Sequence, residues 1–413
     1  MAKNMYRAIH QDSFPADMEI AFGSGSDRQV YRYQRVTWTI DSTEHGLRYG
    51  ENPDQPAALY RLVNGNLILG GVELIGPGHD IVAGSELLQS GKHPSKINVT
   101  DVDAALGILR YFHDEPAAVI VKHNNPSGVA VADTLEQAYH RALMADRIAA
   151  FGGTIAVNGE IDRALAEAIT AYYAEVVVAP EYTSGALDIL AQKKNLRVFR
   201  IATPHTLQSF RHTRFVDFTS LMDGSLVAQL SFEPLDLKDV ELSAASAEHR
   251  GETYRVKRDP SPQEREDMRF GWFVEAGVTS NSVIYVKDRC TVAIGTGEQD
   301  RVGVARIARD KAYWKFADRL CFQATGSGIE SLEDPEEQAA YYAAAGEENG
   351  GLQGATMVSD AFFPFPDGAE VGLQEGVSAI VQPGGALRDR EIIETVNRYG
   401  ATMVFTGQRS FRH

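Results

Sequence analysis

Short apolar runs bounded by glycine, proline or asparagine alternate along the chain with stretches in which apolar residues recur every three or four positions. The short runs predict buried strands, and the longer period predicts amphipathic helices. Strands that alternate with helices in this way are typical of an α/β fold. The predicted strands are residues 117–121, 153–157, 175–178, 197–201, 282–286, 291–294, 378–381 and 401–405.

The helices are predicted between these strands and before them. They comprise residues 101–111, 135–144, 163–173, 184–193, 263–275, 302–320, 335–345 and 389–399. Asp101 and Thr134 are interpreted as N-caps, because their side-chain oxygens can accept the free N–H groups of a first helical turn. Residues 1–40 show no clear pattern and stay unassigned.

The order of predicted elements repeats in the second half of the chain. Residues 175–201 read as strand, proline turn, helix and strand, and residues 377–405 read in the same way. The two stretches share little identity, so the prediction of a duplicated α/β unit rests on element order. The expected organisation is an N-terminal segment (residues 1–40), a first subdomain (41–240) and a second subdomain (241–413). Residues 317–354, acidic and rich in alanine and glycine, are interpreted as an insertion in the second copy.

The charge balance narrows the range of partners. Forty basic and 56 acidic residues give a formal charge of −16. This excess of acid argues against nucleic acid or an anionic membrane surface as the main partner. No signal-peptide core is found, and no apolar run approaches the ~20 residues that cross a bilayer. We therefore expect a cytoplasmic protein.

Cysteine usage excludes several kinds of site. The only two cysteines, Cys290 and Cys321, cannot form a disulfide framework or a four-thiolate zinc site. Buried thiols are favoured, and a single disulfide stays open. His113 and Glu115 match the H-x-E part of a zinc-deaminase signature, but no P-C-x-x-C follows, so no catalytic metal is expected.

The stretch VKHNNPSGVA, residues 121–130, places Lys122 and His123 directly after an apolar run. Ligands of open α/β sheets sit at the carboxyl ends of strands, where these side chains are expected. A neutral imidazole there can act as a general base, and an adjacent ammonium can stabilise an oxyanion. The alternative is a pair of solvated residues at the start of a loop.

Two further loops carry candidate binding residues. Arg48 and Tyr49, in GLRYGENPDQ, offer a guanidinium fork and a hydroxyl to a phosphate or carboxylate, although a surface arginine in a turn is the commoner case. The loop SDAFFPFPDG can sandwich a flat ring between phenylalanines, although adjacent aromatics more often belong to a core. The glycine turn before residue 302 precedes a helix start that can receive an anion. It does not complete a G-x-G-x-x-G fingerprint, and no P-loop occurs, so dinucleotide dehydrogenases and nucleoside triphosphatases are excluded.

Taken together and in order, LRYGENPDQ, VIVKHNNPSGVA, AFGG, SNSVIYVK, SDAFFPF and the terminal RSFRH resemble the AICAR formyltransferase domain of the bifunctional purine-biosynthesis family. AICAR is 5-aminoimidazole-4-carboxamide ribonucleotide. The resemblance runs from about residue 46 to the end of the chain. It implies a duplicated cytidine-deaminase-like α/β unit without the deaminase zinc, and a homodimer whose active sites draw on both subunits. It also implies that a structural monovalent cation can bind.

The resemblance implies a role for each candidate. His123 is expected to take a proton from the AICAR amine, and Lys122 to stabilise the tetrahedral oxyanion and assist departure of the folate nitrogen. The expected AICAR contacts are Arg48, Tyr49, Gly152, Glu175, Asn281, Phe362 and Arg409. The expected folate or partner-subunit contacts are Arg301, Val302, Asp367, Ala386 and Leu387.

The main departure from the family lies at the N-terminus. Only 46 residues precede Leu47, too few for the cyclohydrolase domain that comes before this motif in the bifunctional protein. The expectation is a stand-alone enzyme that transfers the formyl group of 10-formyltetrahydrofolate to AICAR, without inosine monophosphate cyclohydrolase activity. Two alternatives stay open: a formyltransferase with another donor or another aminoimidazole ribonucleotide acceptor, and a non-catalytic nucleotide-binding regulator.

Overall fold

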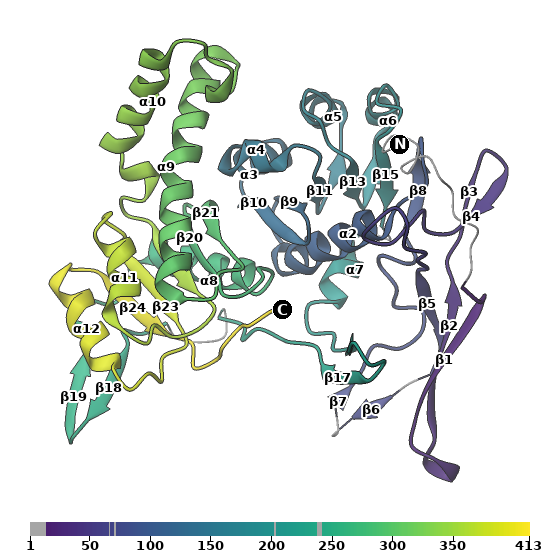
Figure 1. Cartoon of the computed structure of the whole chain (residues 1–413), viewed down its shortest axis with the longest axis horizontal. Helices are drawn as coiled ribbons and strands as arrows, with labels where there is room; N and C mark the ends of the chain where they lie inside the picture. Colours follow the sequence, from purple (N-terminus) through teal and green to yellow (C-terminus); the bar gives the residue numbers. More distant parts are fainter. Residues whose placement is uncertain (1–13, 66, 70–71, 202–203, 238–241) are drawn as a thin grey trace. The chain divides into compact units, whose positions relative to one another are not determined.

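A computed structural model describes residues 14–65, 67–69, 72–201, 204–237 and 242–413, which form both strands and helices (Figure 1). The chain forms two compact units. Unit 1 contains the described residues of Met1–Asp114 and Gly152–Glu233, and unit 2 contains Glu115–Phe151 and Pro234–His413. The predicted subdomains, residues 41–240 and 241–413, were inferred from a repeat in the sequence, whereas these two units are defined by their internal contacts. The subdomain boundaries therefore stay a prediction.

Unit 2 is built on a run of strands with the order β24-β23-β22-β20-β21-β10-β9. Strands β22, β23 and β24 are parallel, and the pairs β20–β22, β20–β21, β21–β10 and β10–β9 are antiparallel. The strands are β9 (Ala117–Lys122), β10 (Asn125–Val131), β20 (Val283–Lys287), β21 (Cys290–Gly295), β22 (Thr356–Ser359), β23 (Ala379–Gln382) and β24 (Thr402–Phe405). A separate hairpin joins β18 (Ser246–His249) and β19 (Glu252–Arg255).

The helices of unit 2 follow its strands. They are α3 (Leu135–Ala145), α4 (Arg147–Ala150), α8 (Pro262–Glu275), α9 (Arg301–Thr325), α10 (Pro335–Glu347), α11 (Pro366–Leu373) and α12 (Asp389–Arg398). In Figure 1, α10 runs beside the long α9. Short 3-10 turns span Ile329–Ser331 and Asn349–Gly351.

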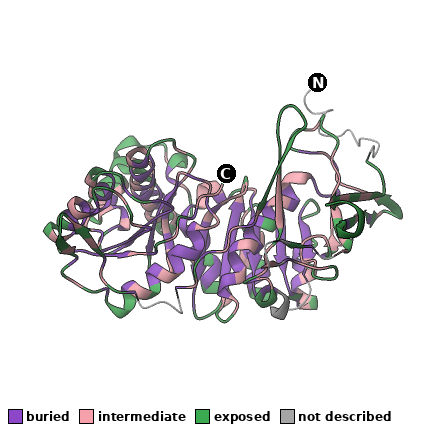
Figure 2. Cartoon of the chain, turned by 90° about the horizontal axis from the view of Figure 1, so that it is seen from below, coloured by how far each residue is buried: buried purple, intermediate pink, exposed green. Residues whose placement is uncertain are grey.

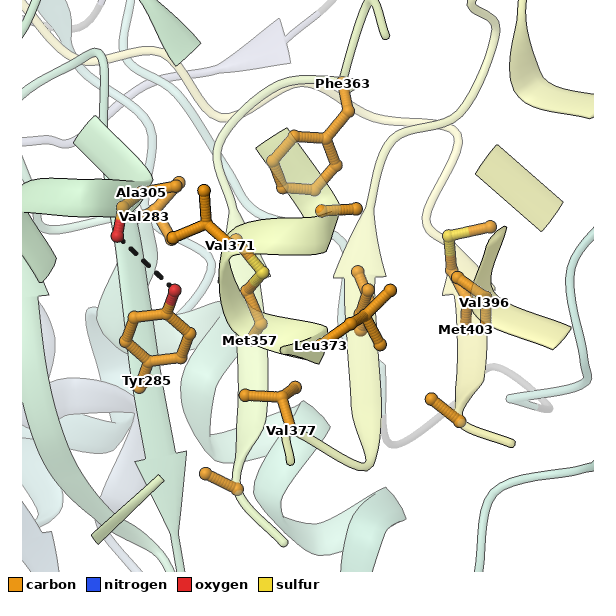
Figure 3. Close-up of a cluster of buried hydrophobic side chains, with 14 of the residues drawn as sticks. Val283, Tyr285, Ala305, Met357, Phe363, Val371, Leu373, Val377, Val396 and Met403 are labelled. Carbon is orange, nitrogen blue, oxygen red and sulfur yellow. Dashed lines mark hydrogen bonds between the residues drawn. The ribbon is translucent and has the colours of Figure 1, made fainter. Parts of the chain in front are cut away.

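The core of unit 2 is closed by aliphatic side chains from the strands and from α9, α11 and α12 (Figure 3). Met357, Met403 and Val396 are fully buried there, as is the aromatic ring of Phe363. The Tyr285 hydroxyl, also fully buried, donates to the carbonyl of Ala305 at 3.4 Å, which gives this polar atom a partner inside the apolar cluster.

Unit 1 contains strands in the order β11-β13-β15-β8, of which the first three are parallel and β8 is antiparallel to β15. These are β8 (Glu86–Gln89), β11 (Thr154–Val157), β13 (Val176–Ala179) and β15 (Arg197–Arg200). The helices are α2 (Lys96–Leu109), α5 (Arg163–Thr170), α6 (Ser184–Leu190) and α7 (Pro204–Ser209). Figure 2 shows mostly buried residues along the central strands of each unit.

Smaller elements complete unit 1, and most of their strand pairs are antiparallel, whereas β12 and β14 pair in parallel. A three-stranded sheet has the order β1-β2-β5 and encloses a small core around Tyr31. The remaining elements are β1 (Asp17–Phe22), β2 (Gln29–Arg35), β3 (Trp38–Ile40), β4 (Thr43–His45), β5 (Tyr60–Asn64), β6 (Ile68–Leu69), β7 (Val72–Glu73), β12 (Glu160–Ile161), β14 (Glu181–Tyr182), β16 (Val216–Ser220), β17 (Leu226–Leu230) and 3-10 turns at Gly25–Asp27 and Arg110–Phe112. The unassigned N-terminal segment therefore contains strands from Asp17 onward, and residues 1–13 lie outside the described residues.

The α/β prediction is confirmed, and all eight predicted strands are found within about one or two residues of their expected ends. Thr134 caps α3, accepting from the Gln137 N–H at 3.2 Å. The prediction that Asp101 is an N-cap is wrong. Helix α2 begins at Lys96 because Ser95 and Asn98 form a reciprocal capping box, and Asp101 lies buried one turn further on.

Both cysteines are free thiols, as predicted; Cys321 is fully buried, whereas Cys290 is half-buried. Burial raises the pKa of the Cys290 thiol to about 11, so it is protonated at neutral pH. Within the described residues, no helix combines the length and apolar character needed to cross a bilayer.

Candidate functional site

Lys122 and His123 lie at the tip of the β9–β10 hairpin in unit 2. Lys122 pairs with Asn125 across the hairpin, so His123 and Asn124 form a two-residue turn. Their φ angles are 55° and 61°, in the left-handed region that two-residue hairpins need at both central positions. Asparagine tolerates this region, but a histidine there is uncommon. The consecutive asparagines and the proline therefore end the strand sharply and hold both basic side chains at its end.

A cavity of about 160 Å³ adjoins this hairpin and is lined by both side chains. Lys311 and Lys315 of α9 also line it, while Asp146 contributes the one carboxylate among its lining residues. Burial lowers the pKa of Lys311, an effect that Lys315 reinforces and Asp146 opposes. Its ammonium donates to the Ile294 carbonyl at 3.0 Å. The cavity is therefore cationic, and it suits a ligand or transition state that carries negative charge.

The short helix α4 fixes the position of Lys122. The Lys122 ammonium donates to the carbonyl of Phe151, directly after α4, at 2.7 Å. Two buried ion pairs join α4 and its N-cap to α9: Asp146 with Lys315 at 2.8 Å, and Arg147 with Asp318 through two N–H···O bonds at 2.8 and 3.1 Å.

Replacing Arg147 with lysine is expected to lower the free energy of unfolding by about 1–2 kcal/mol, because lysine keeps the charge but cannot form the two-bond fork with Asp318. Urea unfolding measures this change. Arg163→Lys is the matched control, since Arg163 and Glu167 form an exposed ion pair whose loss is expected to cost less than about 0.5 kcal/mol. Equal effects of the two substitutions would contradict a role for the buried fork.

Unit 1 holds a second group of predicted residues, around Arg48 and Tyr49. The backbone here is tied to the start of α2, since the Arg48 N–H donates to the Pro94 carbonyl and the Lys96 N–H donates to the Tyr49 carbonyl, both at 2.9 Å. The Arg48 guanidinium lies over the Tyr49 ring at 5.0 Å and is 8% exposed. Among the described residues, no carboxylate forms an ion pair with Arg48.

Sequence reasoning missed three residues that surround Arg48: His45, His93 and Arg197. The rings of His45 and His93 meet edge to face with centroids 4.9 Å apart. Burial is the main cause that lowers the pKa of His93 to about 4, and the nearby guanidiniums of Arg48 and Arg197 add to it. His93 is therefore neutral at physiological pH. The one available signal was an arginine at the start of a strand predicted to be buried, residues 197–201.

Glu175 and Gly152 belong to the same part of unit 1. Glu175 lies 3.9 Å from Arg197 and accepts from the Asn98 amide at 3.2 Å. Gly152 has a φ of 75°, and its N–H donates to the Tyr173 carbonyl at 2.8 Å. Its left-handed φ explains why a glycine stands at this position.

A third group of predicted residues gathers at the start of α9 in unit 2. Arg301 is buried and donates to the Asn281 amide oxygen and the Ser282 carbonyl, each at 2.9 Å, and it forms an ion pair with the fully buried Asp360. The structure thus brings together Asn281 and Arg301, which the sequence placed in different roles.

The phenylalanines in the loop after Asp360 differ in their exposure to solvent. Phe362 is 41% exposed, whereas Phe363 is fully buried in the core (Figure 3). The hypothesis that both rings sandwich a ligand is therefore wrong, because Phe363 has its packing partners inside the protein. Of the two adjacent rings, that of Phe362 is available to a flat ring, and Phe365, further along the same loop, is 48% exposed.

The remaining predicted residues lie on loops and helix starts of unit 2. Val302 is half-buried in the first turn of α9, and Asp367 lies in the first turn of α11. Ala386 and the almost fully exposed Leu387 follow β23. The Arg409 guanidinium stacks on the Phe411 ring at 4.3 Å.

The sequence of the chain is similar to a known protein family. The family model described as the AICARFT/IMPCHase bienzyme matches residues 9–311. The chain is 36% identical over 380 residues to the bifunctional purine biosynthesis protein PurH of Bacillus subtilis (strain 168), an alignment that covers 92% of this chain and 61% of that protein. It is 36% identical over 373 residues to PurH of Chlorobaculum parvum, covering 90% and 59%. The chain therefore spans about three fifths of the length of these relatives.

Proposed function

Because the chain belongs to the AICARFT/IMPCHase bienzyme family, we propose that it transfers the formyl group of 10-formyltetrahydrofolate to the 5-amino group of AICAR. The observation that carries the proposal is the hairpin that holds Lys122 and His123 beside a cationic cavity. A general base next to an ammonium is what attack by a weakly nucleophilic amine on a formyl carbon requires.

In the proposed reaction His123 accepts a proton from the AICAR amine as its nitrogen bonds to the formyl carbon. The carbonyl oxygen becomes an oxyanion, which the Lys122 ammonium stabilises. The bond between the formyl carbon and the folate N10 then breaks, and N10 takes the proton that His123 had accepted, which restores the imidazole and leaves tetrahydrofolate and formyl-AICAR. His123 is suited to the first step because histidine is the side chain that most often transfers protons as a general base.

The binding roles complete this proposal. Arg48, Tyr49, Gly152, Glu175, Asn281, Phe362 and Arg409 contact AICAR, whereas Arg301, Val302, Asp367, Ala386 and Leu387 contact the folate or a partner subunit. Phe362 supports this scheme because its exposed ring can stack on a flat heterocycle. A cytoplasmic homodimer is part of the proposal. So is a structural monovalent cation, a ligand that suits buried oxygens without a hydrogen-bond partner among the described residues, such as Glu275 Oε2 and Ser410 Oγ.

The proposed fold is a duplicated cytidine-deaminase-like unit. In support, the order helix, hairpin, helix, strand, helix, strand, helix, strand runs from α2 to β15 when the short α4 and the two-residue strands β12 and β14 are set aside. The same order runs from α8 to β24, with the additional helix α10. A catalytic metal is not part of the proposed mechanism.

The test is an assay of the purified chain with AICAR and 10-formyltetrahydrofolate, in which tetrahydrofolate is followed by absorbance and the purine product is identified by mass. We expect formyl-AICAR without inosine monophosphate, because we propose a chain that lacks cyclohydrolase activity. Inosine monophosphate at enzymatic rates would contradict that part. AICAR binding without turnover would contradict the folate donor, and formate with ATP is the donor to test next.

A further inference from the structure

Arg197 occupies an unusual place for a charged residue. It is the first residue of β15, the strand Arg197–Arg200 of unit 1. The next two residues of this strand are buried and apolar, and an apolar side chain is usual at such a position. Arg197 is only 7% exposed. Burial lowers the pKa of its guanidinium, which shows that the surroundings do not fully compensate the charge.

The hydrogen bonds of Arg197 are incomplete. Its Nε is buried and has no hydrogen-bond partner among the residues that the structure describes. Its Nη1 makes only a long contact of 3.5 Å with the Asn195 carbonyl and lies 3.9 Å from the Glu175 carboxylate. A guanidinium carries five N–H donors, and burying them without acceptors is costly. An incompletely satisfied buried arginine of this kind requires a further acceptor.

The surroundings of Arg197 have an excess of positive charge. Arg48 is a second buried guanidinium close enough to lower the pKa of Arg197, and both cations act on His93. Glu175 is the carboxylate that opposes them, and its side chain is 43% exposed. We call Arg48, His93 and Arg197 the cationic cluster. The two guanidiniums and the neutral imidazole supply many N–H donors. Among the described residues, their counter-charge is the single, partly solvated carboxylate of Glu175.

A dianionic group with several oxygens supplies both what Arg197 lacks, hydrogen-bond acceptors, and what the cationic cluster lacks, negative charge. Phosphate monoesters match the planar donor forks of arginine, which can form two parallel bonds to neighbouring oxygens. A single carboxylate offers only two oxygens and one charge. Tyr49, under the Arg48 guanidinium, and the exposed Tyr173 add aromatic surface beside the cluster, as a nucleotide requires.

We propose that Arg197 is a phosphate-binding residue of the nucleotide site and acts with Arg48 and His93 on the phosphate monoester of a ribonucleotide. The identity of that nucleotide as AICAR rests on the proposed function, whereas the phosphate assignment rests on the cationic cluster. Arg197 is thus a specificity-determining residue that selects the nucleotide over its nucleoside.

The test compares two ligands and two variants by calorimetry. Arg197→Met is expected to raise the Kd for AICAR about 10- to 100-fold, the range for charge-assisted hydrogen bonds, and to leave the Kd for the unphosphorylated AICA riboside unchanged. Arg200→Met is the matched control on the same strand, because the half-exposed Arg200 pairs with Glu86 at the surface. It is expected to change neither Kd.

Arg197→Lys provides a second variant that keeps the charge, should the methionine variant fold poorly. It is expected to bind AICAR with intermediate affinity, since a lysine cannot reproduce the fork. Equal weakening of nucleotide and nucleoside, or unchanged AICAR affinity in both variants, would overturn the assignment. If the wild-type chain binds adenosine monophosphate or another 5′-mononucleotide through Arg197 but not AICAR, the phosphate role stands and the proposed function fails.

Discussion

Replacing His123 with asparagine is expected to lower kcat by about 10²-fold or more, while the Kd for AICAR changes by less than about threefold. The histidine is proposed to remove the amine proton only as the new bond forms, so its loss acts on the transition state rather than on ground-state binding. Asparagine is chosen because it tolerates the left-handed φ of 55° at this position, whereas alanine adds a backbone penalty.

The measurement is a full kinetic comparison of wild type and variant, with AICAR binding followed separately by calorimetry. His140→Asn is the control, since His140 is an exposed residue of α3, and its replacement is expected to leave kcat unchanged. Normal turnover would remove His123 as the base.

The central elements were predictable because their apolar runs are local signals. Residues 117–121 carry enough consecutive apolar side chains to predict a buried strand, and the asparagines and proline after His123 predict a sharp turn. Together these placed Lys122 and His123 at a strand end, as the structure has them. The start of α2 was less predictable, since Ser95, Asp101 and other polar residues nearby can each act as a cap.

The cationic cluster could not be predicted in the same way. His93 and Arg197 are about a hundred positions apart in the chain, and neither lies in a recognisable motif. They become neighbours only because the loop before α2 and the start of β15 meet in the folded unit. The same holds for α4, whose ion pairs with α9 join residues 146–147 to residues 315 and 318. Long-range contacts of this type leave no periodic signal in a single sequence.

Replacing Asp360 with asparagine is expected to lower the free energy of unfolding by about 3–5 kcal/mol, the range for breaking a buried ion pair. Asp360 is fully buried, pairs with Arg301, and accepts from the Ser280 hydroxyl at 2.6 Å and from the Ser282 N–H at 3.0 Å. A neutral amide leaves the Arg301 charge uncompensated in a buried site. Urea unfolding measures the loss, with unchanged m-values as the condition for comparison.

The control is Asp310→Asn, because Asp310 is an exposed residue of α9 whose ion pair with Arg309 is expected to contribute less than about 0.5 kcal/mol. A double variant, Arg301→Met with Asp360→Leu, separates two causes. If the large loss comes from an orphaned charge, removing both charges restores part of the stability, since apolar pairs can replace buried ion pairs. If the double variant is less stable than Asp360→Asn alone, the bonds from Arg301 to Asn281 and Ser282 are what hold the start of α9 in place, and the buried charge is secondary.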